Sequence, residues 1–177
     1  MESLTTIIEQ KDFASHPLLA RLLELHDIPK QISIEGTLPE VVIDEYGRLT
    51  PRILTIVGSR KNTAYGRRAL EMLISTLHGE DVLILSGLAF GIDGIAHTLA
   101  LKHNLKTVAI PGSGLDRKVL YPSSHIQLAQ DILEKDGALL SEFSHTTSPA
   151  PWTFPQRNRI MAALSDALLV VEAEEKS

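Results

Sequence analysis

The residues best suited to chemistry lie together between positions 151 and 161, in the stretch Pro-Trp-Thr-Phe-Pro-Gln-Arg-Asn-Arg-Ile-Met. Guanidinium groups bind phosphates, an amide side chain hydrogen-bonds a base edge, and an aromatic ring stacks on an exposed base. This combination favours the binding of single-stranded nucleic acid. The candidate contact residues are Trp152, Phe154, Arg157, Asn158 and Arg159. The alternative is structural, with the aromatic rings buried and the two arginines clamping loop carbonyls.

Three glycine-containing loops, each directly after an apolar run, carry further candidates. Glycine lets the backbone turn sharply and approach a ligand, and the N–H groups of the helix that follows the first loop attract an anion such as phosphate. Each loop taken alone also fits a plain turn followed by solvated residues. The candidates are Gly58, Ser59, Arg60 and Lys61 in the first loop, Ser86, Gly87, Leu88, Ala89, Gly91 and Asp93 in the second, and Gly112, Ser113 and Gly114 in the third.

The signatures of common nucleotide-binding and hydrolytic sites are absent. The sequence has no G-x-x-x-x-G-K-[ST] phosphate loop and no G-x-S-x-G nucleophile elbow, and its second loop departs from the G-x-G-x-x-G pattern of NAD-binding proteins. There is no cysteine, and no spacing of histidines and carboxylates indicates a metal site. We interpret His97 as a packing residue. The sequence therefore predicts a binding protein that is not an enzyme and that has no catalytic residue, metal or cofactor.

The elements that must position these loops alternate regularly from residue 53 onward. Continuous apolar runs are typical of parallel strands that helices cover on both faces, and short connections between runs indicate βαβ units. The runs predict strands at 53–57, 82–85, 107–110, 138–140 and 167–171, and helices at 65–78, 91–103, 123–135 and 156–165. The predicted fold class is α/β, an extended Rossmann-like, doubly wound and mainly parallel sheet. Right-handed crossovers then bring the loops after the strands to one edge of the sheet.

The first part of the chain has a different pattern, and we interpret residues 1–48 as an extension that precedes a DNA-binding domain at 49–177. Ser15 and Pro17 suit the start of a single helix over 15–27, which carries a leucine stripe. Short strands are expected at 31–35 and 41–44, with residues 36–39 turning between them.

Charge and composition limit the class of protein and the kind of ligand that the chain can bind. The 177-residue chain is 44% hydrophobic and 22% charged, as expected for one globular domain with an extension. Its net charge is −5, but residues 52–160 hold twelve Lys/Arg against nine Asp/Glu, so the loops lie in a positive segment. No apolar stretch approaches the ~20 residues of a membrane span, and the start resembles no signal peptide. We therefore expect a cytoplasmic protein.

The ordered set of loops resembles the DNA-processing protein A (DprA or Smf) family. The resemblance rests on four stretches: Ile56 to Arg60, Ser86 to Asp93, Gly112 to Asp116 with Tyr121-Pro122, and Phe154 to Ile160. It covers about residues 16–177. Members of this family usually continue beyond the equivalent of Ser177, so the resemblance implies a chain truncated at its C-terminus.

The resemblance implies a function as well as a fold. Proteins of this family bind single-stranded DNA without reading its sequence, and load the recombinase RecA onto incoming DNA during natural transformation in competent bacteria. They form homodimers, and no catalytic activity is implied. Carried over by position, the three glycine-containing loops and residues 154–159 would line the DNA-binding groove.

Two alternatives remain open. The Lonely Guy type of nucleotide phosphoribohydrolase has a related fold, but its catalytic loop reads Pro-Gly-Gly-x-Gly-Thr, whereas this chain has Pro-Gly-Ser-Gly-Leu-Asp at 111–116. The other alternative is a protein-interaction module that uses the acidic N-terminal segment as its contact face. Release of free base from AMP would indicate the former, and loss of partner binding on deletion of residues 1–48 the latter.

Overall fold

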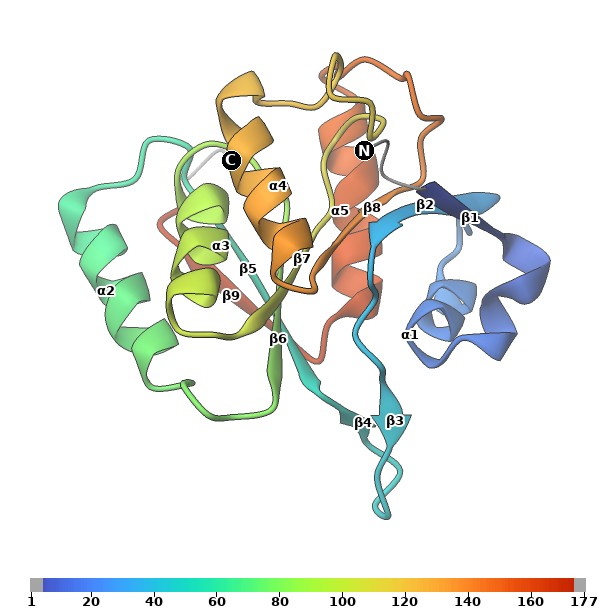
Figure 1. The fold of residues 1–177 in the computed structure, drawn as a ribbon, viewed down its shortest axis with the longest axis horizontal. Coiled ribbons are helices and arrows are strands. Elements are labelled where there is room, and N and C mark those ends of the chain that lie inside the picture. Colours follow the sequence, from blue (N-terminus) through green and yellow to red (C-terminus); the bar gives the residue numbers. More distant parts are fainter. Residues whose placement is uncertain (1–4, 174–177) are drawn as a thin grey trace.

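A seven-stranded sheet runs through the molecule in the order β1-β2-β8-β7-β6-β5-β9 (Figure 1). The computed structural model describes residues 5–173. Five neighbouring strands are parallel; next to them β2 runs in the opposite direction, and β1 at the end of the sheet is antiparallel to β2. The parallel strands are β5 (Arg52–Gly58), β6 (Val82–Ser86), β7 (Lys106–Ala109), β8 (Ala138–Ser141) and β9 (Ala167–Val171). These five strands and the mainly parallel α/β sheet confirm the prediction.

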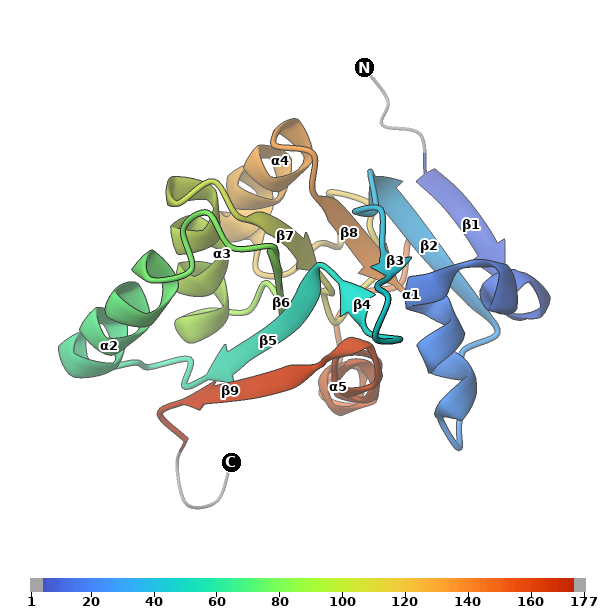
Figure 2. The same ribbon diagram turned by 90° about the horizontal axis from the view of Figure 1, so that it is seen from below.

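Helices cover both faces of the central parallel strands, which explains their continuous apolar runs, whereas Leu168 and Val170 of the edge strand β9 are exposed. Three helices, α2 (Ala64–Ser75), α3 (Ile92–Lys102) and α4 (Ile126–Glu134), lie on one face, and α5 (Thr153–Leu164) lies on the other (Figure 2). Along β6 the fully buried side chains alternate between the two layers: Ile84 packs with α2 and α3, and Leu83 and Leu85 pack with α5. The central strands therefore sit inside a three-layer sandwich.

Helix boundaries differ from the prediction mainly at the starts of α4 and α5 and at the end of α2, which lies at Ser75 and not at residue 78. Residues Ser123–His125 form a separate 3-10 turn (η3) before α4, and α5 begins three residues earlier than expected, at Thr153. Pro155 lies in the first turn of α5, where its missing N–H has no intrahelical acceptor to lose. It therefore does not mark the boundary that the sequence suggested.

The N-terminal segment extends the sheet. Strand β1 (Thr5–Glu9) pairs with β2 (Gln31–Gly36), which pairs on its other side with β8, both antiparallel. The single helix predicted at 15–27 is wrong: the chain forms 3-10 turns at Gln10–Ser15 (η1) and Arg21–Glu24 (η2) around a short helix, α1 (Pro17–Ala20). The helix is short because none of these three turns has a side-chain cap and the backbone is extended again at Leu25.

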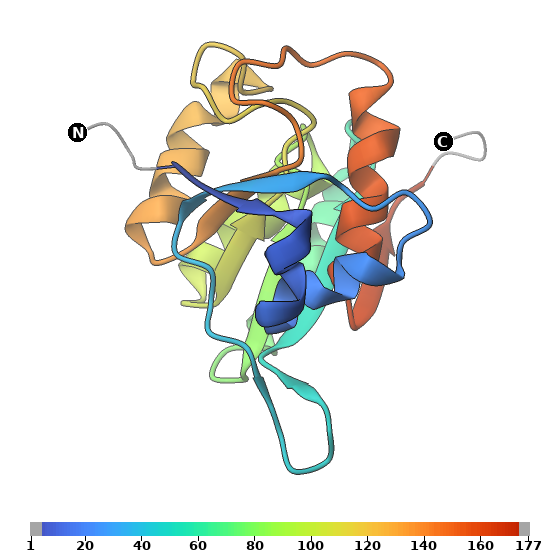
Figure 3. The same ribbon diagram turned by 90° about the vertical axis from the view of Figure 1, so that its right-hand side faces the viewer.

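The expected turn at 36–39 does not pair the two strands that flank it. Strand β3 (Val42–Ile43) instead pairs with β4 (Leu49–Thr50) in a hairpin that projects from the body of the molecule (Figure 3). Strand β3 does not pair with β2, because β1 and β8 already occupy both edges of β2. The Asp44 carboxylate closes the hairpin by accepting hydrogen bonds from the backbone N–H groups of Tyr46 and Arg48.

One hydrophobic core joins the N-terminal segment to the sheet. Its buried members from the segment are Phe13, Leu18, Leu19, Leu22, Ile32, Ile34 and Val41. They pack against the face of the sheet that α5 also covers. The division of the chain between residues 48 and 49 stays a prediction, and the two parts share this core.

Strands β6 and β9 lie on opposite sides of β5, so the strand order reverses there. In open parallel sheets, ligands bind outside the carboxyl ends of the strands at such a switch point. Within residues 5–173, no helix is long and apolar enough to cross a membrane.

Candidate nucleic-acid interface

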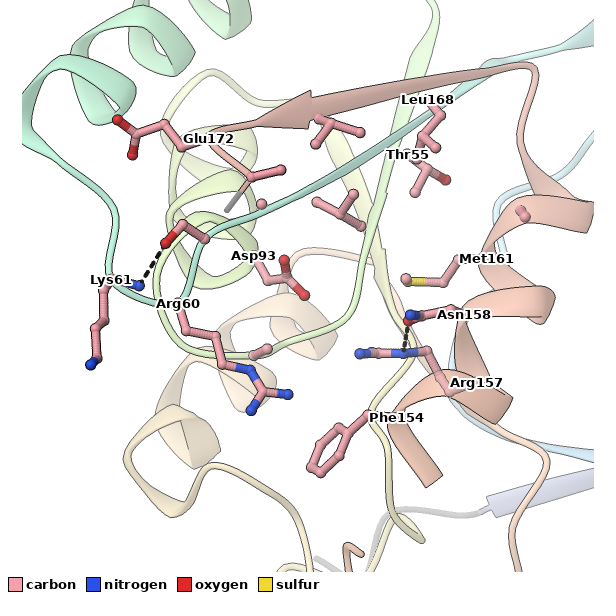
Figure 4. A pocket seen from close by; sticks show the side chains of 17 residues that line it. Thr55, Arg60, Lys61, Asp93, Phe154, Arg157, Asn158, Met161, Leu168 and Glu172 are labelled. Atoms are coloured by element: carbon pink, nitrogen blue, oxygen red, sulfur yellow. Dashed lines mark hydrogen bonds between the residues drawn. The ribbon is translucent and has the colours of Figure 1, made fainter. Parts of the chain in front are cut away.

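An open cavity of about 780 Å³ lies at this switch point, between β5, β9 and α5 (Figure 4). Its lining includes the following predicted residues: Gly58, Ser59, Arg60, Lys61, Ala89, Asp93, Phe154, Arg157 and Asn158. The structure thus brings together the first loop, part of the second loop and the start of α5. The cavity also has an apolar side that the sequence reasoning missed, formed by Met161, Leu168 and Val170. The alternation of side chains along β9 is the signal that could have indicated it.

The loop after β5 presents two cations at the cavity. The side chains of Arg60 and Lys61 are exposed, and the loop is held by a hydrogen bond of 3.0 Å from the Lys61 N–H to Ser59 Oγ. Gly58 has no room for a side chain, because a Cβ there would overlap the carbonyl oxygen of Val171 on β9. The close pairing of β5 with β9 therefore fixes where the two cations emerge.

The N-terminus of α2, which follows this loop, is already filled. The backbone N–H of Thr63 donates to the Glu172 carboxylate at 2.7 Å, and the Thr63 hydroxyl donates to its other oxygen. The N–H of Gly66 in turn donates to Thr63 Oγ1 at 3.1 Å. These hydrogen bonds lower the pKa of Glu172, so the carboxylate is charged at neutral pH. A carboxylate of the chain itself thus occupies the N–H of Thr63, and the expectation that the start of this helix holds a ligand phosphate stays a prediction.

The second loop is rigid and mostly buried. The Asp93 carboxylate accepts a hydrogen bond of 3.2 Å from the N–H of Gly87, and the N–H of Ile92 donates to the carbonyl of Ser59. Gly91 has a φ of +74° and lies against the backbone of the first loop, so only glycine fits there. Burial raises the pKa of Asp93, and the nearby Arg157 opposes that rise. The remaining predicted residues of this loop, Ser86, Gly87 and Leu88, are buried and do not line the cavity.

The third loop supports the site from behind. Gly112, Ser113 and Gly114 are all buried, and none lines the cavity. A Cβ on Gly112 would press against the ring of Phe154, so this glycine sets the position of that ring. Further along the loop, Arg117 binds the buried carboxylate of Glu35 on β2.

Arg157 is a clamp at the centre of the site. Its side chain is 4% exposed, and its Nη1 donates to the carbonyl of Gly87, at 2.7 Å, and to the carbonyl of Ile110. Those carbonyls follow β6 and β7, so one guanidinium joins two loops. Burial lowers the pKa of Arg157 to about 10, which still leaves it charged at neutral pH. Its Nε donates to Asn158 Oδ1, which faces the cavity.

Arg159 is not part of the cavity lining. Its guanidinium pairs with Glu142 and, at 3.6 Å, with Asp27 of the N-terminal segment. Trp152 is exposed and packs edge to face on Phe143, also away from the cavity lining. Of the contact residues predicted around α5, Arg159 and Trp152 therefore lie outside the cavity lining, and the other three line it: Phe154, Arg157 and Asn158.

Two of the predicted contact residues, Arg60 and Phe154, form a cation–aromatic contact at the cavity. The guanidinium carbon lies 4.9 Å from the ring centroid, although the two residues come from opposite sides of the cavity (Figure 4). A cation over an aromatic face attracts both components of a nucleotide, because the cation suits phosphate and the ring suits a base.

The residues that might have carried other chemistry have structural roles. His97 is fully buried, its Nδ1 lies 2.7 Å from Thr107 Oγ1, and burial lowers its pKa to about 3. This confirms its interpretation as a packing residue. Among residues 5–173, no group of three or more histidine and carboxylate side chains is placed to hold a metal ion.

Comparison with known proteins gives consistent matches. The model of the family described as DNA recombination-mediator protein A matches residues 5–177. Protein Smf from Escherichia coli is 41% identical over 157 residues, which cover 89% of this chain and 39% of that protein. DNA processing protein DprA from Streptococcus pneumoniae is 37% identical over 156 residues, which cover 88% of this chain and 51% of that protein. The chain thus spans between two fifths and one half of the length of these relatives.

Two solved structures share the fold. DNA processing protein A from Streptococcus pneumoniae superposes with a TM-score of 0.79 at 31% identity, over all of this chain and 56% of that one. DNA processing protein A from Helicobacter pylori, whose structure describes its single-stranded DNA binding mode, has a TM-score of 0.77 at 29% identity, over 99% of this chain and 73% of that one. The likeness confirms the predicted Rossmann-like fold class.

Proposed function

Because the chain belongs to the DNA recombination-mediator protein A family, we propose that it binds single-stranded DNA largely without sequence specificity and loads the RecA recombinase onto it during natural transformation. The observation that carries the binding proposal is the cavity at the β5/β9 switch point, where Arg60 lies over the ring of Phe154. Supporting it, the structure of the Helicobacter pylori relative concerns that protein's binding of single-stranded DNA.

The chemistry of the cavity suits a nucleic-acid strand of any sequence. The cations of Arg60 and Lys61 would contact phosphates, and the Phe154 ring would stack on a base. Neither contact reads a base edge, so neither distinguishes sequences. Because the Glu172 carboxylate already accepts a hydrogen bond at the start of α2, we expect the side-chain cations of Arg60 and Lys61 to bind the phosphates. Binding should therefore weaken as salt rises, since neutralising phosphates releases counterions.

The predicted contact residues take two roles in this proposal. Arg60, Lys61, Phe154 and Asn158 would contact the strand, because their side chains face the cavity. The buried glycines and serines of the second and third loops would act by holding that geometry. Arg159 keeps its predicted DNA role only as a proposal, because the structure engages its guanidinium with acidic side chains.

The test is a titration of a fluorescent oligo-dT of about 20 nucleotides, at low and moderate salt, with matched duplex as competitor. We expect preference for the single strand and a steep loss of affinity with salt. Replacing Arg60 with alanine should lower affinity roughly tenfold and reduce the salt slope by about one unit. The matched control is Arg48→Ala, which removes a second cation over an aromatic ring, at 4.7 Å from the ring centroid of Tyr46 in the projecting hairpin. Equal binding by Arg60→Ala and wild type would refute the site.

Recombinase loading and self-association are separate proposals that rest on the family. They are tested by RecA-dependent strand exchange on single-stranded DNA coated with its binding protein, and by sedimentation of the free chain. Stimulation of exchange that Arg60→Ala loses would support loading. If Arg60→Ala still stimulates strand exchange, loading of RecA does not depend on the cavity.

We also propose that the site binds without catalysis. The two carboxylates that line the cavity have structural partners: Asp93 accepts a hydrogen bond from the N–H of Gly87, and Glu172 accepts one from the N–H of Thr63. Incubation with AMP should therefore release no adenine. Measurable release by the purified chain, abolished by Asp93→Asn, would establish the nucleotide hydrolase alternative instead.

A further inference from the structure

A row of aromatic rings leads away from the cavity across the carboxyl ends of the strands. It begins at Phe154 on α5, continues to Tyr121 in the loop after β7 with a centroid distance of 5.8 Å, and reaches Phe90 in the loop after β6 at 5.9 Å. His125 closes the row at 5.6 Å from Phe90. Arg60 lies over the ring of Phe154 at the other end. Segments far apart in the sequence thus build one continuous surface.

Two rings of the row are accessible to a ligand. Phe90 is 41% exposed and Tyr121 is 36% exposed. Neighbouring rings meet edge to face, at interplanar angles of 62° to 85°, so they do not stack on one another. An edge-to-face neighbour covers a ring only in part, which leaves aromatic surface available for stacking.

The loop does not allow Phe90 to withdraw from solvent. Its neighbours Ala89 and Ile92 are buried, and hydrogen bonds join the carbonyl of Ala89 to the N–H of Gly94 and the N–H of Ile92 to the carbonyl of Ser59. A large apolar side chain that a rigid loop holds in water is unfavourable for the isolated protein. It becomes favourable once a flat, partly apolar ligand covers it.

The chemistry of the row indicates what that ligand is. One end of the row adjoins the two cations of the cavity mouth, Arg60 and Lys61, and the rest is aromatic. A polymer with a charged backbone and flat rings matches both parts, and base stacking on aromatic side chains tolerates any sequence. An apolar peptide would match the rings but would leave the cations without a counterpart.

Resting on the proposed function, we infer that Phe90 and Tyr121 are base-stacking residues, and that a bound single strand runs from the cavity along Phe154, Tyr121 and Phe90. The backbone phosphates contact Arg60 and Lys61 at the start of this path, and the following bases lie on the row. The binding site therefore extends across the ends of β5, β7 and β6 and takes several nucleotides.

The test compares Phe90→Ala and Tyr121→Ala with wild type on two 20-nucleotide probes: oligo-dT, and an oligomer of the same backbone whose central nucleotides are abasic. Each substitution should weaken binding to oligo-dT about tenfold, since stacking on an aromatic side chain contributes roughly that much per base. On the abasic probe the same variants should bind like wild type, because no base is present to stack. Phe90→Tyr and Tyr121→Phe should restore binding to oligo-dT.

The control is Tyr46→Ala, which removes an exposed aromatic ring in the projecting hairpin, 72% exposed and with the Arg48 guanidinium over its face, at a distance from the row. If the row variants bind oligo-dT as wild type does while Arg60→Ala is weakened, the row is refuted and the proposed function stands. A loss that is equal on both probes would also refute base stacking. Failure of the wild-type chain to bind either probe would overturn both proposals together.

Discussion

At the scale of single residues, the two arginines of the cavity have opposite roles. Arg157 clamps the carbonyls of Gly87 and Ile110 from a buried position, whereas Arg60 is exposed at the cavity mouth. Arg157→Ala should therefore lower the free energy of unfolding by about 3 kcal/mol, because it leaves two carbonyls and the buried Asp93 without their cation. Urea denaturation followed by circular dichroism measures this loss.

Arg60→Ala is the control for that experiment. It should unfold at the wild-type urea concentration while its affinity for DNA falls. If Arg157→Ala keeps wild-type stability and loses only DNA affinity, then Arg157 contacts DNA and its hydrogen bonds to the two carbonyls do not stabilise the fold.

His97 makes stability depend on pH. Its pKa is about 3 in the folded protein and about 6.5 in the unfolded chain, so between these values only the unfolded chain takes up the proton. The stabilisation is complete above pH 6.5 and is lost progressively as the pH falls toward 3, with a slope of about 1.4 kcal/mol per pH unit. Urea titrations between pH 7 and pH 4.5 should show this slope in wild type and a shallower one in His97→Gln. His145→Gln, at an exposed position, should retain the wild-type slope.

The sequence predicted the kinds of contact residues better than their directions. Arg157 and Arg159 are two apart on α5, so their side chains point to different sides of the helix, one toward the cavity and one toward Glu142 and Asp27. That divergence follows from helical geometry once both residues are assigned to a helix. The occupation of the α2 N-terminus by Glu172 does not follow from any local pattern, because 109 positions separate Glu172 from Thr63.

At the scale of elements, α2 is held at its start by Thr63 and Glu172. Thr63→Ala removes the hydroxyl that accepts from the N–H of Gly66 and should destabilise the protein by about 1 kcal/mol. Thr76→Ala is the control, since this exposed threonine at the other end of the same helix bonds only to the carbonyl of Leu73. Thermal unfolding of the two variants should separate them, and equal melting temperatures would contradict the role of the cap.

The charge of Glu172 adds a pH dependence to the same cap. Its pKa is lowered in the folded protein, so its stabilisation is present above the unfolded value of about 4.3 and is lost as the pH falls through the folded value. Glu172→Gln should consequently be less stable than wild type at pH 7, and the difference should disappear in acid. Glu134→Gln, an exposed substitution on α4, should show no such convergence.

The elements that the sequence predicted well are those whose burial leaves a clear pattern of apolar residues. Strands β5 to β8 were identified because strands between two layers require continuous apolar runs. The apolar run of β9 was identified as well, although its Leu168 and Val170 are exposed at the cavity. Strand β1 was missed because it is a half-exposed edge strand, in which Thr5 and Glu9 weaken the apolar signal. The helix predicted at 15–27 failed because a leucine stripe marks burial, and short 3-10 turns bury leucines as well.

At the scale of the whole molecule, the N-terminal segment shares the sheet and the core with the rest of the chain. It supplies β2 to the edge of β8, a share of the common core, and the ion pair between Glu35 and Arg117. Deleting residues 1–48 should leave a chain that unfolds without a cooperative transition, because the apolar face shared with α5 becomes exposed. Circular dichroism during urea titration tests this. A cooperative transition and intact DNA binding by the shortened chain would instead establish the boundary at residue 48 as a true domain limit.

The parallel pairing of β5 with β9 joins the first and the last of the five parallel strands, with Leu54 opposite Ala167. Contacts between residues so far apart in sequence form late, since a long loop of chain must close before they can be made. During synthesis on the ribosome, the three central strand pairings can therefore form before the cavity has its second wall. The proposed capacity to bind nucleic acid therefore waits for the pairing of β9 with β5, so a strand of RNA or DNA finds no finished cavity while only β5 to β8 have been synthesised.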